Sequence, residues 1–420
     1  MLDPTSIQRR TLRLLFVTQI ISGIGVATGS TVGALLAADL ASVAVSGLAG
    51  SAVVIGAAVF ALPGAAIVRR RGRRPSLAAG YFIAAVGAML VVVAALHGSI
   101  PLLFAGFFLF GGATAANLQA RYAAVDLAPP QLRGRHLSLI VWATTLGAVA
   151  GPQFAAVSGT ALAGYGVPML AAPFFFSALL LATAGLGLLI FLRPDPAIVA
   201  GTAGAPSAGV GTGGVVPALK AVLARAPATL GVSAMAIGQM VMSGVMAMTP
   251  VHIKSAGHDA AHTLRVVGVV LSFHIAGMYA FAPLMGWLTD RLGRRPVIFL
   301  GVILLLGACV LAGTAGNNNA VQLSAGLMVL GLGWSACTVA GSTLLTESIP
   351  PELRASGQGL SDLVMGLAGA TAGALSGAIV GLWSYAMLTL VAAIASVVMI
   401  LLVAIFRLRQ KRGAAGEAQA

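Results

Sequence analysis

The chain has 420 residues, of which 59% are hydrophobic and only 8% are charged. Soluble domains carry about 25% charged residues, so this composition excludes a soluble globular enzyme, a disordered protein and a nucleic-acid binder. The apolar positions suffice for a helical protein that crosses a membrane many times, because each span needs about 20 of them. Cys309 and Cys337 lie in apolar stretches, so no disulfide framework is predicted.

Twelve long apolar runs follow one another along the chain. We place these spans at residues 12–38, 44–68, 76–97, 101–123, 138–163, 167–192, 228–252, 265–289, 296–315, 321–346, 357–382 and 385–406. The first run is too long for a signal peptide and no small-residue cleavage site follows it, so we expect it to be retained. The predicted fold class is an all-α membrane protein with twelve transmembrane helices.

The positive charges lie on one side of these spans. Of the 24 Lys and Arg residues, 22 fall in the two termini or in loops that follow an even-numbered span, and the exceptions are Lys254 and Arg265. Cytoplasmic loops carry the excess of Lys and Arg in helical membrane proteins, so we expect both termini in the cytoplasm. The net charge of +14 then reflects topology and not nucleic-acid binding.

The two halves of the chain repeat at one offset. Gly72-Arg73-Arg74-Pro75 recurs 221 residues later as Gly293-Arg294-Arg295-Pro296. At the same offset, Asp126-x-x-Pro129-Pro130 recurs as Glu347-x-x-Pro350-Pro351, and Ser22–Thr28 matches Ser243–Thr249. Three matches predict a parallel repeat of six spans. We expect an N-terminal bundle at 1–193, a flexible cytoplasmic linker at 194–217 and a C-terminal bundle at 218–420.

The loop between spans 8 and 9 contains Gly286-x-x-x-Asp290-Arg291-x-Gly293-Arg294-Arg295. With the spans and the repeat, it resembles the loop signature of the major facilitator superfamily. The resemblance implies two pseudo-symmetric six-helix bundles that move a solute by alternating access. It also implies a gating latch formed by Gly286, Asp290, Arg291, Gly293, Arg294 and Arg295. In the first half, Arg69 replaces the Asp and Ala65 replaces the first Gly, which leaves open whether a first-half latch functions.

Methionine and histidine are concentrated in residues 235–285, which hold seven of the 14 methionines and four of the six histidines. The repeat-related positions of the first half carry no such groups, so the enrichment is not part of the shared scaffold. Met242 and Met246 lie one turn apart on span 7, and His274 and Met278 do so on span 8. Three thioethers and an imidazole form a soft ligand set that selects Cu(I) over harder ions.

The combination of Met-x-x-x-Met on span 7 and His-x-x-x-Met on span 8 resembles the copper-importing branch of the superfamily. That branch supplies copper to bacterial respiratory oxidases. The resemblance implies that Met242, Met246, His274 and Met278 bind the metal. Sister members of that branch resemble riboflavin importers, so branch membership alone does not fix the substrate. Methionine also fills gaps in apolar packing, and that interpretation stays open.

Further residues carry weaker signals. Met248, His252, His258 and His262 form a candidate auxiliary metal relay, although packing and a solvated outer loop explain them as well. Asp362 lies more than a turn inside span 11, which indicates proton coupling or a carboxylate hydrogen-bonded near the interface. Arg121, at the end of span 4, either pairs across the bundle or anchors the span.

The main alternative is proton-coupled transport of a small organic solute, as drug or metabolite efflux or as riboflavin-like uptake. Gly147-x-x-x-Gly151-Pro152 resembles part of an antiporter signature, although small residues also serve helix packing. No HExxH, GxSxG or phosphate-binding loop occurs, so we predict neither an enzyme nor a bound cofactor. The leading hypothesis is a monomeric copper importer, surrounded by lipid, of a bacterial inner (plasma) membrane. Transport direction and proton coupling stay open.

Overall fold

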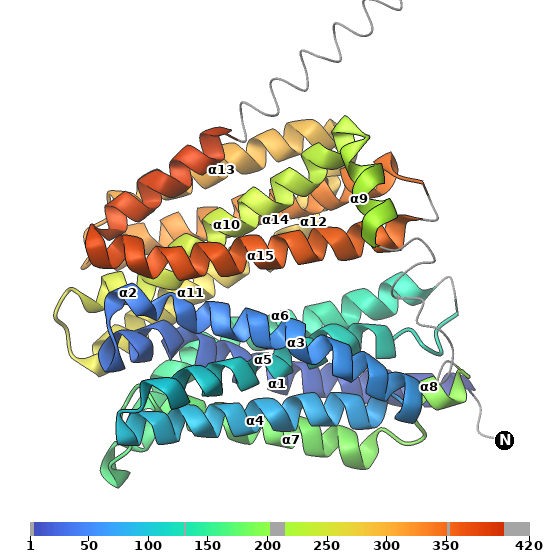
Figure 1. Ribbon diagram of the computed structural model, residues 1–420, viewed down its shortest axis with the longest axis horizontal. Helices are drawn as coiled ribbons and strands as arrows, with labels where there is room; N and C mark the ends of the chain where they lie inside the picture. Colours follow the sequence, from blue (N-terminus) through green and yellow to red (C-terminus); the bar gives the residue numbers. More distant parts are fainter. Residues whose placement is uncertain (1–3, 130–131, 202–214, 351–352, 399–420) are drawn as a thin grey trace, which may run out of the picture. The chain divides into compact units, whose positions relative to one another are not determined.

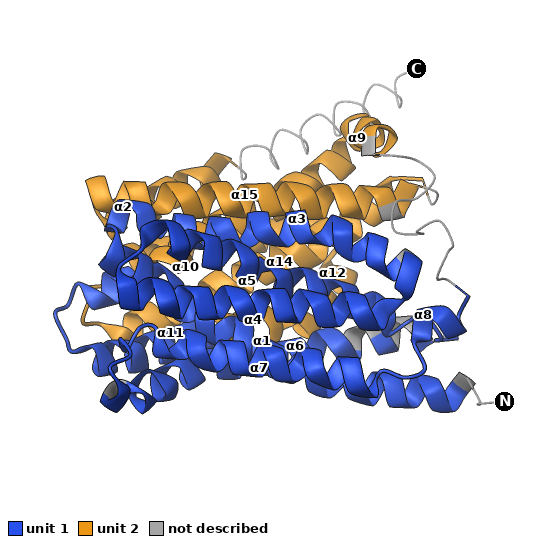
Figure 2. Ribbon diagram, turned by 60° about the horizontal axis from the view of Figure 1, so that its bottom comes forward, with its two compact units in different colours: residues 1–206, 249–272 blue, residues 207–248, 273–420 orange. Residues whose placement is uncertain are grey.

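The computed structural model describes residues 4–129, 132–201, 215–350 and 353–398. All regular elements of this described part are helices (Figure 1). They form two compact units, which Figure 2 colours separately. Unit 1 comprises residues 1–206 and 249–272, and unit 2 comprises residues 207–248 and 273–420.

The first helices in chain order are α1 (Pro4–Leu40), α2 (Val43–Ser46), α3 (Leu48–Arg71), α4 (Arg73–His97), α5 (Ile100–Ala123), α6 (Arg133–Ala161), α7 (Ala172–Phe191) and α8 (Pro196–Val199). They are followed by α9 (Val215–Leu223), α10 (Ala226–Lys254), α11 (Ala260–Tyr279), α12 (Ala282–Leu292), α13 (Arg294–Gly313), α14 (Ala320–Ser348) and α15 (Arg354–Leu382). Part of the predicted linker, Pro196–Val199, therefore forms the short helix α8.

Eleven helical segments of the described part are long and apolar enough to cross a membrane. Each overlaps one of the first eleven predicted spans. The predicted twelfth span, 385–406, begins with the apolar helix Tyr385–Val398 and otherwise falls outside the described residues. The prediction of an all-α membrane protein is confirmed.

The predicted eighth span, 265–289, is interrupted in the structure. Helix α11 ends at Tyr279, and α12 starts at Ala282 with a proline, Pro283, in its first turn. A proline lacks the N–H that would bond back to residue 279, and its ring clashes with that carbonyl. The same ring suits the first turn of a new helix, so the chain begins α12 there.

Glycines allow α6 to pack closely against α1 in unit 1. A Cβ added at Gly147 would overlap the carbonyl oxygen of Ile20, and one at Gly151 would overlap the side chain of Ala27. Small residues at such contacts let two helix backbones approach each other. Packing therefore accounts for the Gly147-x-x-x-Gly151 pattern, which had suggested an antiporter signature.

We expect Gly147→Ala to destabilise the protein by about 1–3 kcal/mol, because the added methyl has no room against α1. Gly50→Ala on α3 is the matched control, since a Cβ there meets no atom within 4 Å. It should be neutral or slightly stabilising, because alanine favours a helix over glycine. Thermal unfolding of both purified variants in detergent measures the difference, and equal unfolding temperatures would contradict the packing argument.

Candidate functional site

The predicted latch in unit 2 is built around Arg294, the first residue of α13. Its guanidinium donates two hydrogen bonds to Glu347 at the end of α14, with N–O distances of 2.6 and 2.9 Å. Asp290, one turn earlier, lies 3.8 Å from the same guanidinium, and its side chain is 79% exposed. The expected partner Asp290 is therefore a minor one, and Glu347 holds the arginine.

Unit 1 contains the same pair 221 residues earlier. Arg73 begins α4, and its guanidinium donates to both carboxylate oxygens of Asp126 at 2.8 and 3.0 Å. Both side chains are largely buried, at 15% and 8% exposure. Two of the three motifs that reveal the repeat in the sequence are thus joined by one bidentate ion pair in each unit. Arg69 replaces the counterpart of Asp290, but this pair does not need a carboxylate at that position.

A third carboxylate, which the sequence analysis did not single out, stabilises the start of α4. Buried Asp195 accepts hydrogen bonds from the backbone N–H groups of Arg73 and Arg74, at 3.1 and 2.7 Å. An anion at this end of a helix satisfies free N–H groups and interacts favourably with the helix dipole. The preceding residue, Gly72, has φ of +91°, which favours glycine, and Asp195 fills the space where a Cβ would lie.

The remaining latch residues have separate environments. Arg291 lies over the ring of Trp287, with 5.1 Å from its guanidinium carbon to the ring centroid. Gly293 has φ of +92°, like Gly72, and separates α12 from α13. A Cβ at Gly286 would meet no atom within 4 Å, so close helix approach does not explain that glycine. Arg295 is half-buried.

Unit 1 encloses a network of neutral polar side chains from α1, α4, α5 and α6. Gln19 donates to the hydroxyl of Tyr81 at 2.6 Å, and that hydroxyl donates to Asn117 at 2.7 Å. Ser22 also donates to Asn117, and Thr144 donates to Gln19, both at 3.0 Å. Gln19, Ser22 and Tyr81 are buried, so each bond replaces lost contact with water.

Arg121 lies one turn beyond Asn117 on α5. Its Nε is buried and has no hydrogen-bond partner among the described residues. A buried cationic donor without a partner is costly, so it marks a position where an anionic or carbonyl group would be favourable. The sequence left two interpretations for Arg121, pairing across the bundle and anchoring the end of the span. In the described part of the structure, its Nε has no protein partner that would support pairing.

Unit 2 brings aromatic and amide groups together. The indole N–H of Trp334 on α14 donates to the Gln239 side-chain oxygen on α10 at 2.7 Å, and Gln239 donates to Ser243 at 3.0 Å. The rings of Tyr279 and Trp334 meet nearly edge to face, with centroids 5.9 Å apart. All four side chains are half-buried, so they remain accessible. The sequence analysis did not single out these residues, although polar side chains inside apolar spans indicate a functional site.

The predicted copper ligands lie on α10 and α11. His274 is fully buried, and Met242 and Met278 are buried too. Glycines at 277 and 331 let α11 pack tightly on α14 at this point, and the His274 Nδ1 lies 2.8 Å from the carbonyl oxygen of Leu327. Because a carbonyl only accepts, Nδ1 carries the proton, and Nε2 presents a lone pair. That Nε2 has no partner among the described residues. Met246, one turn after Met242, is half-buried.

The auxiliary residues lie between Met246 and His274 in the chain, on the last part of α10, before α11 and on its first turn. Met248 is buried and His252 is half-buried on α10, whereas His258 and His262 are exposed, with ring centroids 4.5 Å apart. Asp259 accepts the backbone N–H of His262 at 2.8 Å, and this hydrogen bond lowers the pKa of the Asp259 carboxyl.

His258 also lines a cavity of about 350 Å³ in unit 1, together with Asp39 and Lys254, which form an ion pair. Among the described residues, no group of three or more His, Cys, Asp or Glu side chains could hold a metal ion. Asp362, the predicted proton-coupling residue, is an exposed side chain on α15.

The two ion pairs should differ in what they contribute to stability. Asp126→Asn leaves the largely buried Arg73 without its counter-charge, so we expect a loss of about 3 kcal/mol. Glu347→Gln removes a more exposed partner and should cost below about 1 kcal/mol. Denaturant unfolding of both purified variants tests the ranking, and equal losses would show that burial does not distinguish the pairs.

Comparison with known proteins identifies the family. The Major Facilitator Superfamily model matches residues 15–275 and 258–420. Two Bacillus subtilis (strain 168) proteins described as uncharacterized MFS-type transporters, YdeG and YddS, are 40% and 39% identical over 94% and 93% of this chain, and over 91% and 89% of their own. The riboflavin transporter RfnT of Brucella anthropi is 26% identical over 87% of each chain.

Solved structures support the same fold. A variant of the nucleoside transporter NupG matches with a TM-score of 0.76 at 16% identity, over 94% of this chain and 99% of that one. The D-xylose–proton symporter matches with a TM-score of 0.67 at 18% identity, over 92% and 96%. These relatives give no support to the copper-importing branch. The chain belongs to the major facilitator superfamily and is a multi-pass membrane transporter, not an enzyme.

Proposed function

We propose that this protein is a secondary active transporter of a small organic solute with a planar ring system, and that riboflavin is its best candidate substrate. The observation that carries this proposal is the cluster of Trp334, Tyr279, Gln239 and Ser243 in unit 2. Aromatic side chains offer flat faces to a planar ring, and the amide and hydroxyl offer hydrogen bonds that fix its orientation. The relative described as a riboflavin transporter supports the same substrate class.

The polar network of unit 1 adds groups of the right chemistry, of which Asn117 is half-buried and Gln19 and Tyr81 are buried. Gln19, Asn117 and Tyr81 already exchange hydrogen bonds with one another, so they present fixed dipoles and not mobile side chains. The buried Nε of Arg121 adds a donor without a hydrogen-bond partner in the described part. A solute with carbonyl or ribityl-type hydroxyl groups would satisfy such donors.

In this proposal, transport proceeds by alternating access of the two sequence halves, 1–193 and 218–420, which the linker at 194–217 joins. The pairs Arg73–Asp126 and Arg294–Glu347 hold corresponding helix ends within each half, and Asp290 with its neighbouring arginines acts as the latch. Asp362 is our candidate for proton coupling. Both termini lie in the cytoplasm, and the protein is a monomer in a bacterial inner membrane.

Copper import is a second candidate because of one specific observation. The His274 Nε2 lone pair is buried and has no partner among the described residues, while Nδ1 bonds to a backbone carbonyl. Metal-binding histidines commonly use their second nitrogen in this way. Met278 follows one turn later on α11, and Met242 and Met246 on α10 supply further thioethers, with Met248, His252, His258 and His262 as an auxiliary relay.

Uptake of labelled riboflavin by cells that lack their own importer tests the first proposal. We expect Trp334→Leu to lower uptake roughly tenfold, because it removes both an aromatic face and the hydrogen bond to Gln239. Trp383→Leu is the control, since Trp383 is 65% exposed and outside the cluster. Normal uptake by the Trp334 variant, or no riboflavin uptake by the wild type, would overturn the proposal.

Cellular copper uptake tests the second candidate. If copper is the substrate, His274→Ala and the double variant Met246→Leu, Met278→Leu should abolish uptake, because leucine keeps nearly the volume of methionine but cannot bind the metal. His97→Ala, at an exposed histidine at the end of α4, should have no effect. Unchanged copper uptake in the His274 variant would exclude this metal site.

A further inference from the structure

We propose that the start of α1 and the end of α7 in unit 1 form a binding site for the phosphodiester headgroup of an anionic phospholipid. The proposal rests on a basic cavity, on arginines that have no carboxylate partner among the described residues, and on an apolar side chain beside them. None of these residues takes part in the proposed transport of a solute.

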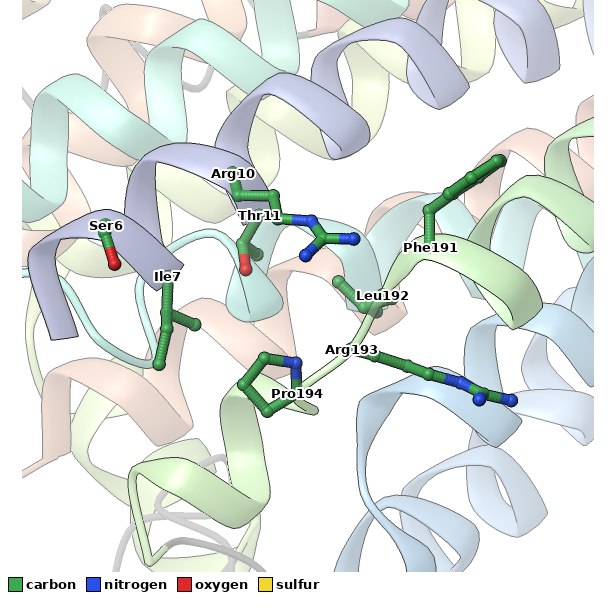
Figure 3. Close-up of a pocket in the computed structure, with 8 residues that line it drawn as sticks. All are labelled: Ser6, Ile7, Arg10, Thr11, Phe191, Leu192, Arg193 and Pro194. Carbon is green, nitrogen blue, oxygen red and sulfur yellow. The ribbon is translucent and has the colours of Figure 1, made fainter. Parts of the chain in front are cut away.

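The cavity lies between the two chain segments. It has a volume of about 90 Å³, and Ser6, Arg10 and Thr11 line one part of it, while Leu192 and Pro194, which follow α7, line another. Figure 3 shows these side chains around the cavity. A second, more open cavity of about 320 Å³ adjoins it through Ser6 and Arg10 and is also lined by Arg9 and Arg13. The two cavities therefore offer hydroxyl and guanidinium donors together.

The arginines at this place are exposed, and the described part of the chain does not neutralise them. Arg9, Arg10 and Arg13 lie within about one turn of α1, and Arg193 lies two residues after the end of α7. Within the described residues, no carboxylate lies within ion-pair distance of these four, and Asp195 is occupied by the backbone of α4. Like charges three or four residues apart destabilise a helix, and a bound anion would reverse that effect.

Topology alone does not account for this arrangement. Arg73 and Arg294 lie at corresponding helix starts, and each has a carboxylate partner. Arg70 is exposed and unpaired within the described part, but it lines neither cavity. The α1–α7 site combines both properties, free positive charge and a concave surface, and a guanidinium binds a phosphate through parallel hydrogen bonds.

An apolar side chain at the cavity favours a lipid over a soluble anion. Phe191 at the end of α7 lines the cavity and is 54% exposed. Acyl chains would cover such an apolar side chain, while the headgroup would occupy the basic cavity. The charge distribution of the sequence places this end of the protein in the cytoplasm, where basic pockets between transmembrane helices attract anionic lipids.

Native mass spectrometry of the purified full-length protein, with cardiolipin or phosphatidylcholine added, tests the site. We expect cardiolipin to stay bound to the wild type and phosphatidylcholine to be lost. The double variant Arg10→Gln, Arg193→Gln should bind cardiolipin roughly tenfold more weakly, because each arginine contributes to the attraction. Arg70→Gln is the matched control and should behave like the wild type.

Three outcomes would overturn the proposal. The first is that the double variant binds cardiolipin as tightly as the wild type does. The second is that Arg70→Gln weakens cardiolipin binding as much as the double variant does. The third is that inorganic phosphate binds as tightly as cardiolipin. The last result would assign the cavity to a soluble anion. Equal unfolding temperatures of the lipid-free variants would confirm that they fold, and the conservative variant Arg10→Lys, Arg193→Lys provides a second folded comparison that keeps the charge.

Discussion

In each unit, one arginine binds both oxygens of a carboxylate and so ties the start of one helix to the end of another. Arg73 connects α4 to the turn after α5, and Arg294 connects α13 to the end of α14. A bidentate pair fixes orientation as well as distance, because the guanidinium and the carboxylate are both planar. The glycine before each arginine adopts a positive φ, which lets the chain reverse and present the guanidinium to its partner.

The two units share this ion pair but differ in the chemistry of the side chains between their helices. Unit 1 gathers neutral hydrogen-bonding groups on Gln19, Tyr81 and Asn117, whereas unit 2 gathers the rings of Trp334 and Tyr279. The repeat thus supplies the scaffold, and we propose that side chains that differ between the two halves recognise the solute. This division supports a solute with both a flat ring system and polar substituents.

Helix positions were predictable from the sequence because they depend on local composition. The hydrogen-bond and ion-pair partners of side chains were not, because they depend on which helices pack together in the fold. The spans and the repeat follow from apolar runs and from three short sequence matches at one offset. The pairing of Arg294 with Glu347 joins residues 53 apart, and the cap of α4 by Asp195 joins residues about 120 apart, so neither follows from local spacing. Pro283 could have predicted the break between α11 and α12. The long apolar run around it led instead to the prediction of one continuous span.

The substrate is the point on which this account depends most. Purified protein in sealed proteoliposomes, supplied with riboflavin and Cu(I) separately and together, measures it without other cellular transporters. The account predicts that riboflavin accumulates and that copper neither accumulates nor competes, because the aromatic and amide cluster forms the recognition surface. Accumulation of copper without riboflavin would contradict it and would place the function at His274 and the methionines of α10 and α11.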